Sequence, residues 1–136
     1  MQARYKLIFI LTAALSTTLS LPAYGKAEPA RSAEYNKCMD KSEGVDPVML
    51  DCISAEYTRV DKRLNNAYKK LMAKLSAERK KELQEAQRLW LKFTDANCQF
   101  YYDPDGGTSA RLNANECSVT VRILRAEELE SLTPRQ

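Results

Sequence analysis

The chain has 136 residues, of which 44% are hydrophobic and 29% charged, and it contains four cysteines and no histidine. This length suits one small domain built around a single core. The formal net charge is +3, and without the N-terminal cations Arg4 and Lys6 it falls to +1, with 19 basic and 18 acidic residues. A charge this close to zero argues against bulk attraction to nucleic acid or to a membrane surface, so any electrostatic partnership must come from local patches.

The N-terminal segment has the features of a cleavable secretory signal. Two basic residues precede an apolar run from Leu7 to Leu21, and small residues follow at Ala23 and Gly25. The run is shorter than the roughly 20 apolar residues of a membrane span and is interrupted by Thr and Ser. We therefore expect residues 1–25 to be removed and residues 26–136 to form a single soluble domain, periplasmic or secreted. The residue directly after the cleavage site is Lys26 and not cysteine, so a lipoprotein anchor is not supported.

An even number of cysteines in a short exported chain predicts two disulfides. A metal site is not expected, because histidine is absent and no CxxC pair occurs. The preferred pairing is Cys38 with Cys52 and Cys98 with Cys117, since each bridge closes a short local loop. The alternative joins Cys52 to Cys98 and Cys38 to Cys117. It would form if a hairpin centred on Ser76 brought Cys52 and Cys98 together.

Capping and turn signals predict where the first helices begin. Residues 26–31 show no apolar pattern and are expected to form a loose leader. Ser32 to Asp40 is predicted to be a short helix that ends near Gly44. Asp46 is expected to cap the next helix, because the following Pro47 suits a first helical position.

Two long amphipathic helices are predicted on either side of Ser76, because apolar residues recur there at three- and four-residue steps. The first apolar face consists of Tyr57, Val60, Leu64, Ala67, Tyr68, Leu71 and Leu75. The second consists of Leu83, Ala86, Trp90, Phe93, Asn97 and Phe100. Ser76 is a suitable N-cap for the second helix, with Glu78 in its first turn. The short connection predicts that the two helices fold back on each other as an antiparallel pair.

The C-terminal part combines a loop with an ambiguous segment. Tyr101 to Asn113 is predicted to be a loop, because Pro104 and the pair Gly106 and Gly107 stop a helix and favour turns. In the segment from Cys117 to Leu132, a strand pattern is given by Val119, Val121 and Ile123. A helix pattern is given by Cys117, Val121, Leu124 and Leu132. Helix is preferred, because a lone strand would have no partner. The predicted fold is an all-α bundle of three to four helices stabilised by two disulfides.

Charge is segregated along the predicted hairpin. Near its closed tip Glu78 is accompanied by the basic residues Lys62, Arg63, Lys69, Lys70, Lys74, Arg79, Lys80 and Lys81. The open end gathers Asp46, Asp51, Glu56, Asp95, Asp103 and Asp105. Such charge runs are usually solvated surface. The run from Asp103 to Gly106 departs from the EF-hand pattern, so neither calcium nor any other cofactor is predicted.

Polar residues beside the aromatic faces admit two interpretations. They could form a recognition surface, but a hydrogen-bond network that fixes helix packing is favoured. The residues assigned to this structural motif are Asp61, Asn65, Tyr68, Gln87, Arg88, Trp90 and Phe93. No catalytic residue is assigned and no enzyme activity is predicted, because the chain lacks histidine, a GxSxG elbow and a phosphate loop, and its cysteines are committed to bridges.

The order of motifs resembles the LprI-like lysozyme inhibitor family. In the first half the matching residues are Cys38, Cys52, Glu56, Tyr57, Asp61, Leu64, Asn65, Tyr68 and Leu71. In the second half they are Ala86, Gln87, Arg88, Trp90, Phe93, Asp95, Cys98, Gly106, Gly107, Thr108, Cys117, Thr120 and Arg122. The resemblance implies a small helical, disulfide-linked periplasmic or surface protein whose better-studied relatives inhibit lysozyme.

The first functional hypothesis is a proteinaceous inhibitor that blocks the cleft of a lysozyme-type muramidase by protein–protein contact. Such enzymes are cationic with an acidic active site, so an acidic end that bears a protruding loop could be steered into the cleft. Loop exposure and charge select the contact residues Tyr101, Tyr102, Asp103, Asp105 and Thr108, with Asp95 at the rim. The alternative is an envelope interaction module, either a toxin immunity factor or a binder of anionic envelope material through the basic cluster between Lys69 and Lys81.

Overall fold

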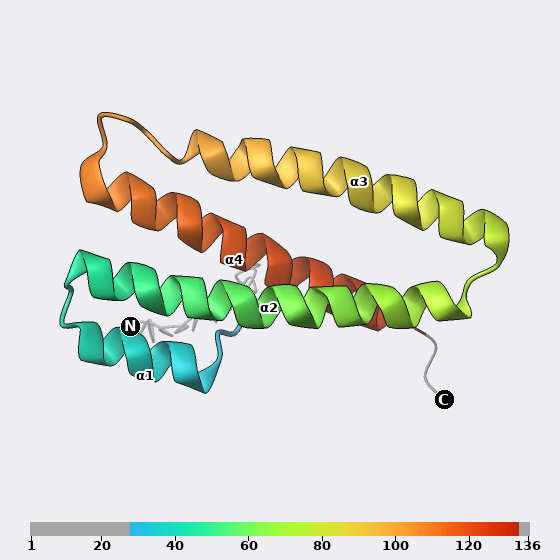
Figure 1. Cartoon of the computed structure of the whole chain (residues 1–136), viewed down its shortest axis with the longest axis horizontal. Helices are drawn as coiled ribbons and strands as arrows, with labels where there is room; N and C mark the ends of the chain where they lie inside the picture. The colour runs from blue at the N-terminus through green and yellow to red at the C-terminus, as the bar shows by residue number, and fades with distance from the viewer. Residues whose placement is uncertain (1–27, 134–136) are drawn as a thin grey trace, which may run out of the picture.

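The computed structural model describes residues 28–133, and this part of the chain folds into four α-helices (Figure 1). They are α1 (Ala33–Ser42), α2 (Asp46–Lys74), α3 (Ala77–Phe100) and α4 (Gly107–Leu132). Helices α2 and α4 lie side by side and run in the same direction, α1 packs against α2, and α3 packs against α4. All regular structure in the described range is helical, which confirms the predicted all-α bundle. The predicted signal sequence, residues 1–25, lies outside the described residues.

The hydrophobic core forms where α2 packs along α4. In the first half of α2 and the middle of α4 the core consists of Ile53, Val60, Val119 and Ile123. Nearer their ends it consists of Leu64, Ala67, Leu71, Ala126 and Leu129. These residues recur at three- and four-residue steps in both helices, so each helix buries one continuous face. The apolar face predicted for α2 is therefore the face that is buried.

The expected direct contact between α2 and α3 needs correction. The turn at Ser76 reverses the chain as predicted, but α2 makes its main contacts with α4 (Figure 1). The reason is that α4 presents apolar side chains with no exposed surface, such as Val119 and Ala126, between residues 119 and 129. Helix α3 reaches the edge of the same core through the half-buried Leu83 and Trp90.

The buried face of α3 also differs from the prediction. Phe93 and Phe100 were expected to face the core, but their side chains are 65% and 86% exposed. Thr94 and Cys98 are buried instead. Each residue along a helix is rotated by about 100° from its neighbour, so burying Thr94 in place of Phe93 turns the phenylalanines away from α4. The bond from Cys98 to Cys117 holds α3 in this rotation.

Two helix starts differ in detail from the sequence prediction. Val45 occupies the N-cap position of α2 and makes no side-chain cap, while Asp46 is already the first helical residue before Pro47. The expected Asp46 cap is therefore wrong, although the helix begins where predicted. At α4, the helix begins at Gly107, whose φ is 62°. The loop predicted to extend to Asn113 is consequently shorter, because residues 108–113 form the first turns of α4.

Both disulfides have the preferred pairing. Cys38 and Cys52 join α1 to α2 with a Cα–Cα distance of 5.7 Å. Cys98 and Cys117 join α3 to α4 with a Cα–Cα distance of 5.4 Å. Each bond therefore ties one peripheral helix to one helix of the central pair. In the described part of the chain, no helix combines the length and the apolar character that crossing a membrane requires.

Candidate partner-binding surface

Arg122 of α4 is only 7% exposed and contacts Asp61, a residue of the predicted structural motif. Its guanidinium lies 4.2 Å from the centre of the Tyr57 ring. Its Nε donates to Oδ1 of Asp61 at 3.3 Å and its Nη1 donates to the Ser118 carbonyl at 3.1 Å. A buried guanidinium is tolerated here because an aromatic face, a carboxylate and a carbonyl together replace its hydration. Asn65 supports the site by donating to Asp61 at 2.8 Å.

Arg125, one turn further along α4, forms a matching site toward α3. Its guanidinium lies 5.9 Å from the centre of the Trp90 ring, and its Nε donates to Oε1 of Gln87 at 3.0 Å. Glu128 accepts from its Nη1 at 2.7 Å. The two arginines therefore bring motif residues of α2 and α3 onto α4. Sequence analysis missed Arg125, because a cation at a buried position does not stand out in an amphipathic pattern.

The remaining motif residues lie apart from these arginines. Tyr68 is half-buried against the core. Arg88 pairs with Glu85 on the exposed side of α3, and the hydrogen bond from Arg88 lowers the pKa of the Glu85 carboxyl. Phe93 is exposed, as described above. The motif thus contains both packing residues and surface residues.

Glu56, which was placed among the acids of the open end, is buried and only 1% exposed. Its carboxylate accepts from the Ser32 backbone N–H at 2.9 Å and from the Ser32 hydroxyl at 2.6 Å, and it also pairs with Arg59. Ser32 is the N-cap of α1. Glu56 therefore anchors the start of α1 on α2 and presents no charge to a partner.

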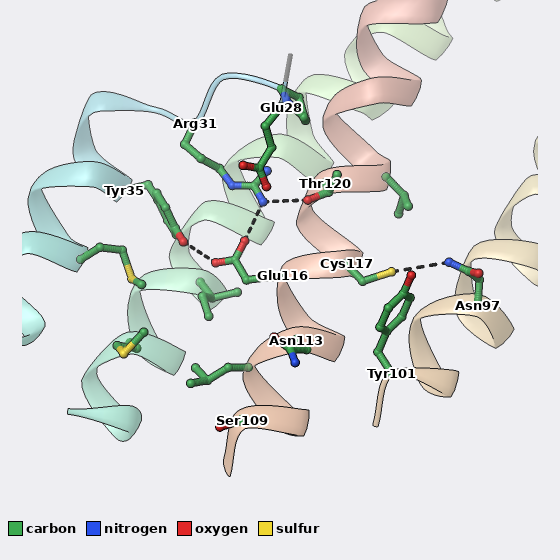
Figure 2. Close-up of a pocket in the computed structure, with 16 residues that line it drawn as sticks. Glu28, Arg31, Tyr35, Asn97, Tyr101, Ser109, Asn113, Glu116, Cys117 and Thr120 are labelled. Atoms are coloured by element: carbon green, nitrogen blue, oxygen red, sulfur yellow. Dashed lines mark hydrogen bonds and ion pairs between the residues drawn. The ribbon is translucent and has the colours of Figure 1, made fainter. Parts of the chain in front are cut away.

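An open groove of about 860 Å³ lies between α1, the start of α2 and the start of α4 (Figure 2). At one end, Arg31 donates to Glu116 at 2.6 Å and to the Thr120 hydroxyl at 2.7 Å, while the Tyr35 hydroxyl also bonds to Glu116. Burial, followed by the hydrogen bond to Glu116, raises the pKa of Tyr35 to about 12. Residue Arg31 of the expected loose leader is thus held against α4. Figure 2 places Tyr101 at the opposite side of the groove.

The loop between α3 and α4 is the acidic and aromatic end of the molecule. Tyr101, Tyr102, Asp103 and Asp105 are all exposed. The Asp103 carboxylate accepts from the Asp105 backbone N–H at 2.9 Å, a local turn that holds the loop in shape. We call these four residues the acidic loop.

The two other predicted contact residues flank the acidic loop. Asp95 lies on α3 and shares a hollow of about 360 Å³ with Tyr102. Thr108 lies in the first turn of α4 and is exposed. Tyr101 lines the groove of Figure 2 and Tyr102 lines this second hollow, so the two tyrosines point to different sides of the loop. The predicted contact residues therefore occupy one end of the bundle but do not form a single flat patch.

The family comparison bears on this arrangement. The family model for the lysozyme inhibitor LprI matches residues 38–129, more than half of the chain. The chain belongs to the lysozyme inhibitor LprI family. No curated protein and no solved structure matches the chain significantly.

The residues matched by the LprI family include all four cysteines, both arginine sites and the acidic loop. LprI is a family of inhibitors rather than of enzymes. Within residues 28–133, no cluster of three or more potential metal-binding side chains is found.

The opposite end of this LprI-family fold is basic. The turn between α2 and α3 is surrounded by Lys69, Lys70, Lys74, Lys80 and Lys81, and we call these residues the basic tip. Part of the positive charge predicted here is neutralised. Arg79 pairs with Glu82, and Arg63 donates two hydrogen bonds to Glu130, which lower the pKa of the Glu130 carboxyl.

Proposed function

We propose that the protein is an extracytoplasmic inhibitor that binds a lysozyme-type muramidase and blocks its substrate cleft. Membership of the LprI family supports this class of target. The observation that carries the proposed mode of binding is the acidic loop, where two exposed tyrosines adjoin two exposed carboxylates. Tyrosine is enriched among the residues that dominate binding energy at protein interfaces, because it buries a large rigid surface and keeps a polar group.

Electrostatics favour the same end of the molecule. A cationic enzyme is attracted to a surface that carries Asp95, Asp103 and Asp105, and none of these three forms an ion pair within residues 28–133. Long-range attraction of this kind raises the association rate, and it weakens as salt screens the charges. The tyrosines then supply the short-range contact that slows dissociation.

The acidic loop is also well suited to fill a cleft without changing shape. The two helices that flank it are joined by the bond between Cys98 and Cys117, and its tip is held by the turn at Asp103. A loop that is already ordered loses little conformational entropy when it binds. The proposed contact set is therefore the acidic loop, with Asp95 and Thr108 at its rim.

The direct test measures muramidase turnover in the presence of the purified chain without residues 1–25. Inhibition of at least one c-, g- or i-type enzyme is expected, with an inhibition constant that rises with ionic strength. The double variant Asp103→Asn and Asp105→Asn should raise that constant by roughly 10-fold, mainly through slower association. No inhibition of any of the three classes at micromolar excess would refute the proposal.

A matched control separates local charge from total charge. Glu78 in the first turn of α3 and Glu127 near the end of α4 are exposed acids, each at the end of its helix that is far from the acidic loop. The double variant Glu78→Gln and Glu127→Gln changes the net charge by the same amount and should leave inhibition unchanged. Equal effects of the two double variants would show that only the net charge matters.

A second candidate function is an envelope interaction module that binds anionic material through the basic tip, and the exposure of four of its five lysines favours it. Charge reversal at Lys70, Lys80 and Lys81 should then abolish retention on anionic envelope polymer and leave muramidase inhibition intact. Retention that survives this reversal would exclude the basic tip as the binding surface.

A further inference from the structure

The smaller hollow, between the C-terminal part of α3 and the first turns of α4, presents mainly hydrogen-bond acceptors. Its volume is about 360 Å³, and we call it the Asp95 hollow. Asp95 is the only charged residue that lines it, and within residues 28–133 this carboxylate forms no ion pair. The other lining residues are Cys98, Gln99, Tyr102, Ala114, Asn115 and Ser118.

Two polar side chains of α4 that line the hollow use their donors within the same helix. The Asn115 amide nitrogen donates to the Arg111 carbonyl at 2.7 Å, and the Ser118 hydroxyl donates to the Ala114 carbonyl at 3.1 Å. The Asn115 amide oxygen and the Ser118 hydroxyl oxygen keep lone pairs that accept from a ligand. Together with the carboxylate of Asp95, these groups favour a ligand that carries N–H donors and a positive charge.

The remaining lining suits the apolar part of a basic side chain. Ala114 and the buried Cys98 supply apolar surface, and Tyr102 supplies an aromatic ring. The methylene stems of lysine and arginine pack on apolar surface while the charged head reaches polar groups, and a cation is attracted to the face of an aromatic ring. A metal ion matches less well, because the hollow offers it a single carboxylate.

The cations of this chain near the hollow do not occupy it. Lys92 on α3 and Arg111 on α4 are exposed and lie one helical turn from lining residues. Neither lines the hollow, and neither forms an ion pair with Asp95. Arg122 donates to Asp61 instead. The choice of a basic side chain as ligand therefore rests on the groups inside the hollow and not on the charge of the surrounding surface.

The Asp95 hollow adjoins the proposed muramidase contact. Tyr102 belongs both to the acidic loop and to the lining of the hollow. The bond between Cys98 and Cys117 holds the two helices that form its walls. A partner that covers the acidic loop therefore also covers the edge of the hollow.

We propose that the Asp95 hollow receives one lysine or arginine side chain of the muramidase, with the Asp95 carboxylate as its ion-pair partner. This inference rests on the proposed function. The acidic loop enters the cleft, and the hollow beside it holds a basic side chain from the rim of the cleft, which fixes the relative orientation of the two proteins. A hydrogen-bonded ion pair acts at short range, so its loss speeds dissociation more than it slows association.

The first test removes the charge in the hollow. Asp95→Asn should raise the inhibition constant by at least about 10-fold, mainly through faster dissociation. This kinetic signature separates a direct contact from steering by Asp103 and Asp105, whose loss slows association. The control is Glu78→Gln, which removes one exposed negative charge at the far end of α3 and should leave inhibition unchanged.

The second test removes the space in the hollow. Ala114→Leu places a larger side chain inside it and should raise the inhibition constant by a similar factor. Leucine favours helix nearly as well as alanine, so α4 should form as in the parent protein. Ala73→Leu is the matched control, because it adds the same side chain at an exposed position near the end of α2 and should leave inhibition unchanged.

A double-mutant cycle identifies the partner group. Basic residues around the muramidase cleft are changed to alanine one at a time and assayed with the parent protein and with Asp95→Asn. One of these changes should weaken inhibition by the parent about 10-fold and inhibition by Asp95→Asn hardly at all, because the same contact is lost only once. If no basic residue of the muramidase couples to Asp95, the inference is wrong.

The outcomes separate this inference from the proposed function. If the parent protein inhibits a muramidase and either Asp95→Asn or Ala114→Leu inhibits equally well, the hollow does not receive the side chain and the proposed function stands. If the parent protein inhibits none of the three enzyme classes, both proposals fail. If sedimentation shows that the free protein is a dimer and that Asp95→Asn dissociates it, the hollow holds a basic side chain of a second copy and the inference is wrong.

Discussion

Replacing Cys98 and Cys117 by alanine removes the covalent link between α3 and α4. The two cysteines are 19 residues apart in the sequence. In the chain-entropy model, closing a loop of this length stabilises the folded state by about 3 kcal/mol at 25 °C. For a domain of this size, that loss corresponds to a fall of roughly 10 to 20 °C in the thermal midpoint.

The location of the effect is more informative than its size. Helix α3 has an exposed apolar stripe on one side and contacts the bundle mainly through α4. Without the bond, its C-terminal half retains the packing of Thr94 and Trp90 but loses the link that keeps Cys98 buried. Local opening of this half should therefore precede global unfolding.

The assay is amide hydrogen exchange together with chemical denaturation. In the double variant Cys98→Ala and Cys117→Ala, residues 91–106 should exchange much faster while the central pair of α2 and α4 stays protected. The control is the double variant Cys38→Ala and Cys52→Ala, whose cysteines are 14 residues apart. This control should lose a similar free energy of unfolding, about 3 kcal/mol, but expose α1 instead.

Two results would refute this reasoning. One is a loss of less than about 1 kcal/mol in the free energy of unfolding, which would mean that helix packing alone holds α3 in place. The other is the same exchange pattern in both double variants, which would mean that the domain opens only as a whole.

Three further predictions concern buried polar groups. Glu56→Ala leaves the Ser32 donors without an acceptor and should cost roughly 2 to 3 kcal/mol, measured by denaturant unfolding; an unchanged midpoint would contradict it. The pKa of Tyr35 is raised to about 12, so its stabilising effect is complete below pH 10 and is lost as the pH rises to about 12. The free energy of unfolding measured across this pH range should fall less steeply in Tyr35→Phe than in the parent protein. The same slope in both proteins would exclude a contribution of Tyr35 to the pH dependence. Arg122→Met removes the hydrogen bond to Asp61 and should lower the free energy of unfolding by about 1 to 3 kcal/mol in the same assay. A more stable variant would show that the buried cation destabilises the fold.

Much of the candidate surface could be predicted because it depends on local sequence. Pro104 and the glycine pair stop α3 and place exposed tyrosines and aspartates in a turn. Phe93 and Phe100 could not be assigned correctly in this way. A stripe that includes them is as apolar as the side that α3 buries, so periodicity alone selects the wrong side.

The buried arginines of α4 illustrate the same limit. In the sequence, Arg122 and Arg125 interrupt an apolar segment and resemble surface residues. Their cost of burial is offset only when Tyr57, Asp61, Gln87 and other groups from α2 and α3 converge on them. That convergence depends on contacts between residues far apart in the chain.

The amino-acid sequence by itself determined the helical class, the reversal at Ser76, the apolar face of α2 and the preferred disulfide pairing, because these follow from 3.6-residue periodicity, capping and loop length. Only the tertiary structure decided that α4 rather than α3 packs along α2 and that α3 turns Phe93 and Phe100 toward solvent. Helix partners and helix rotation depend on the competition among several amphipathic faces for one core. Helices α2 and α4 have the better-matched apolar faces and pack on each other, and the bond between Cys98 and Cys117 fixes how α3 packs on α4.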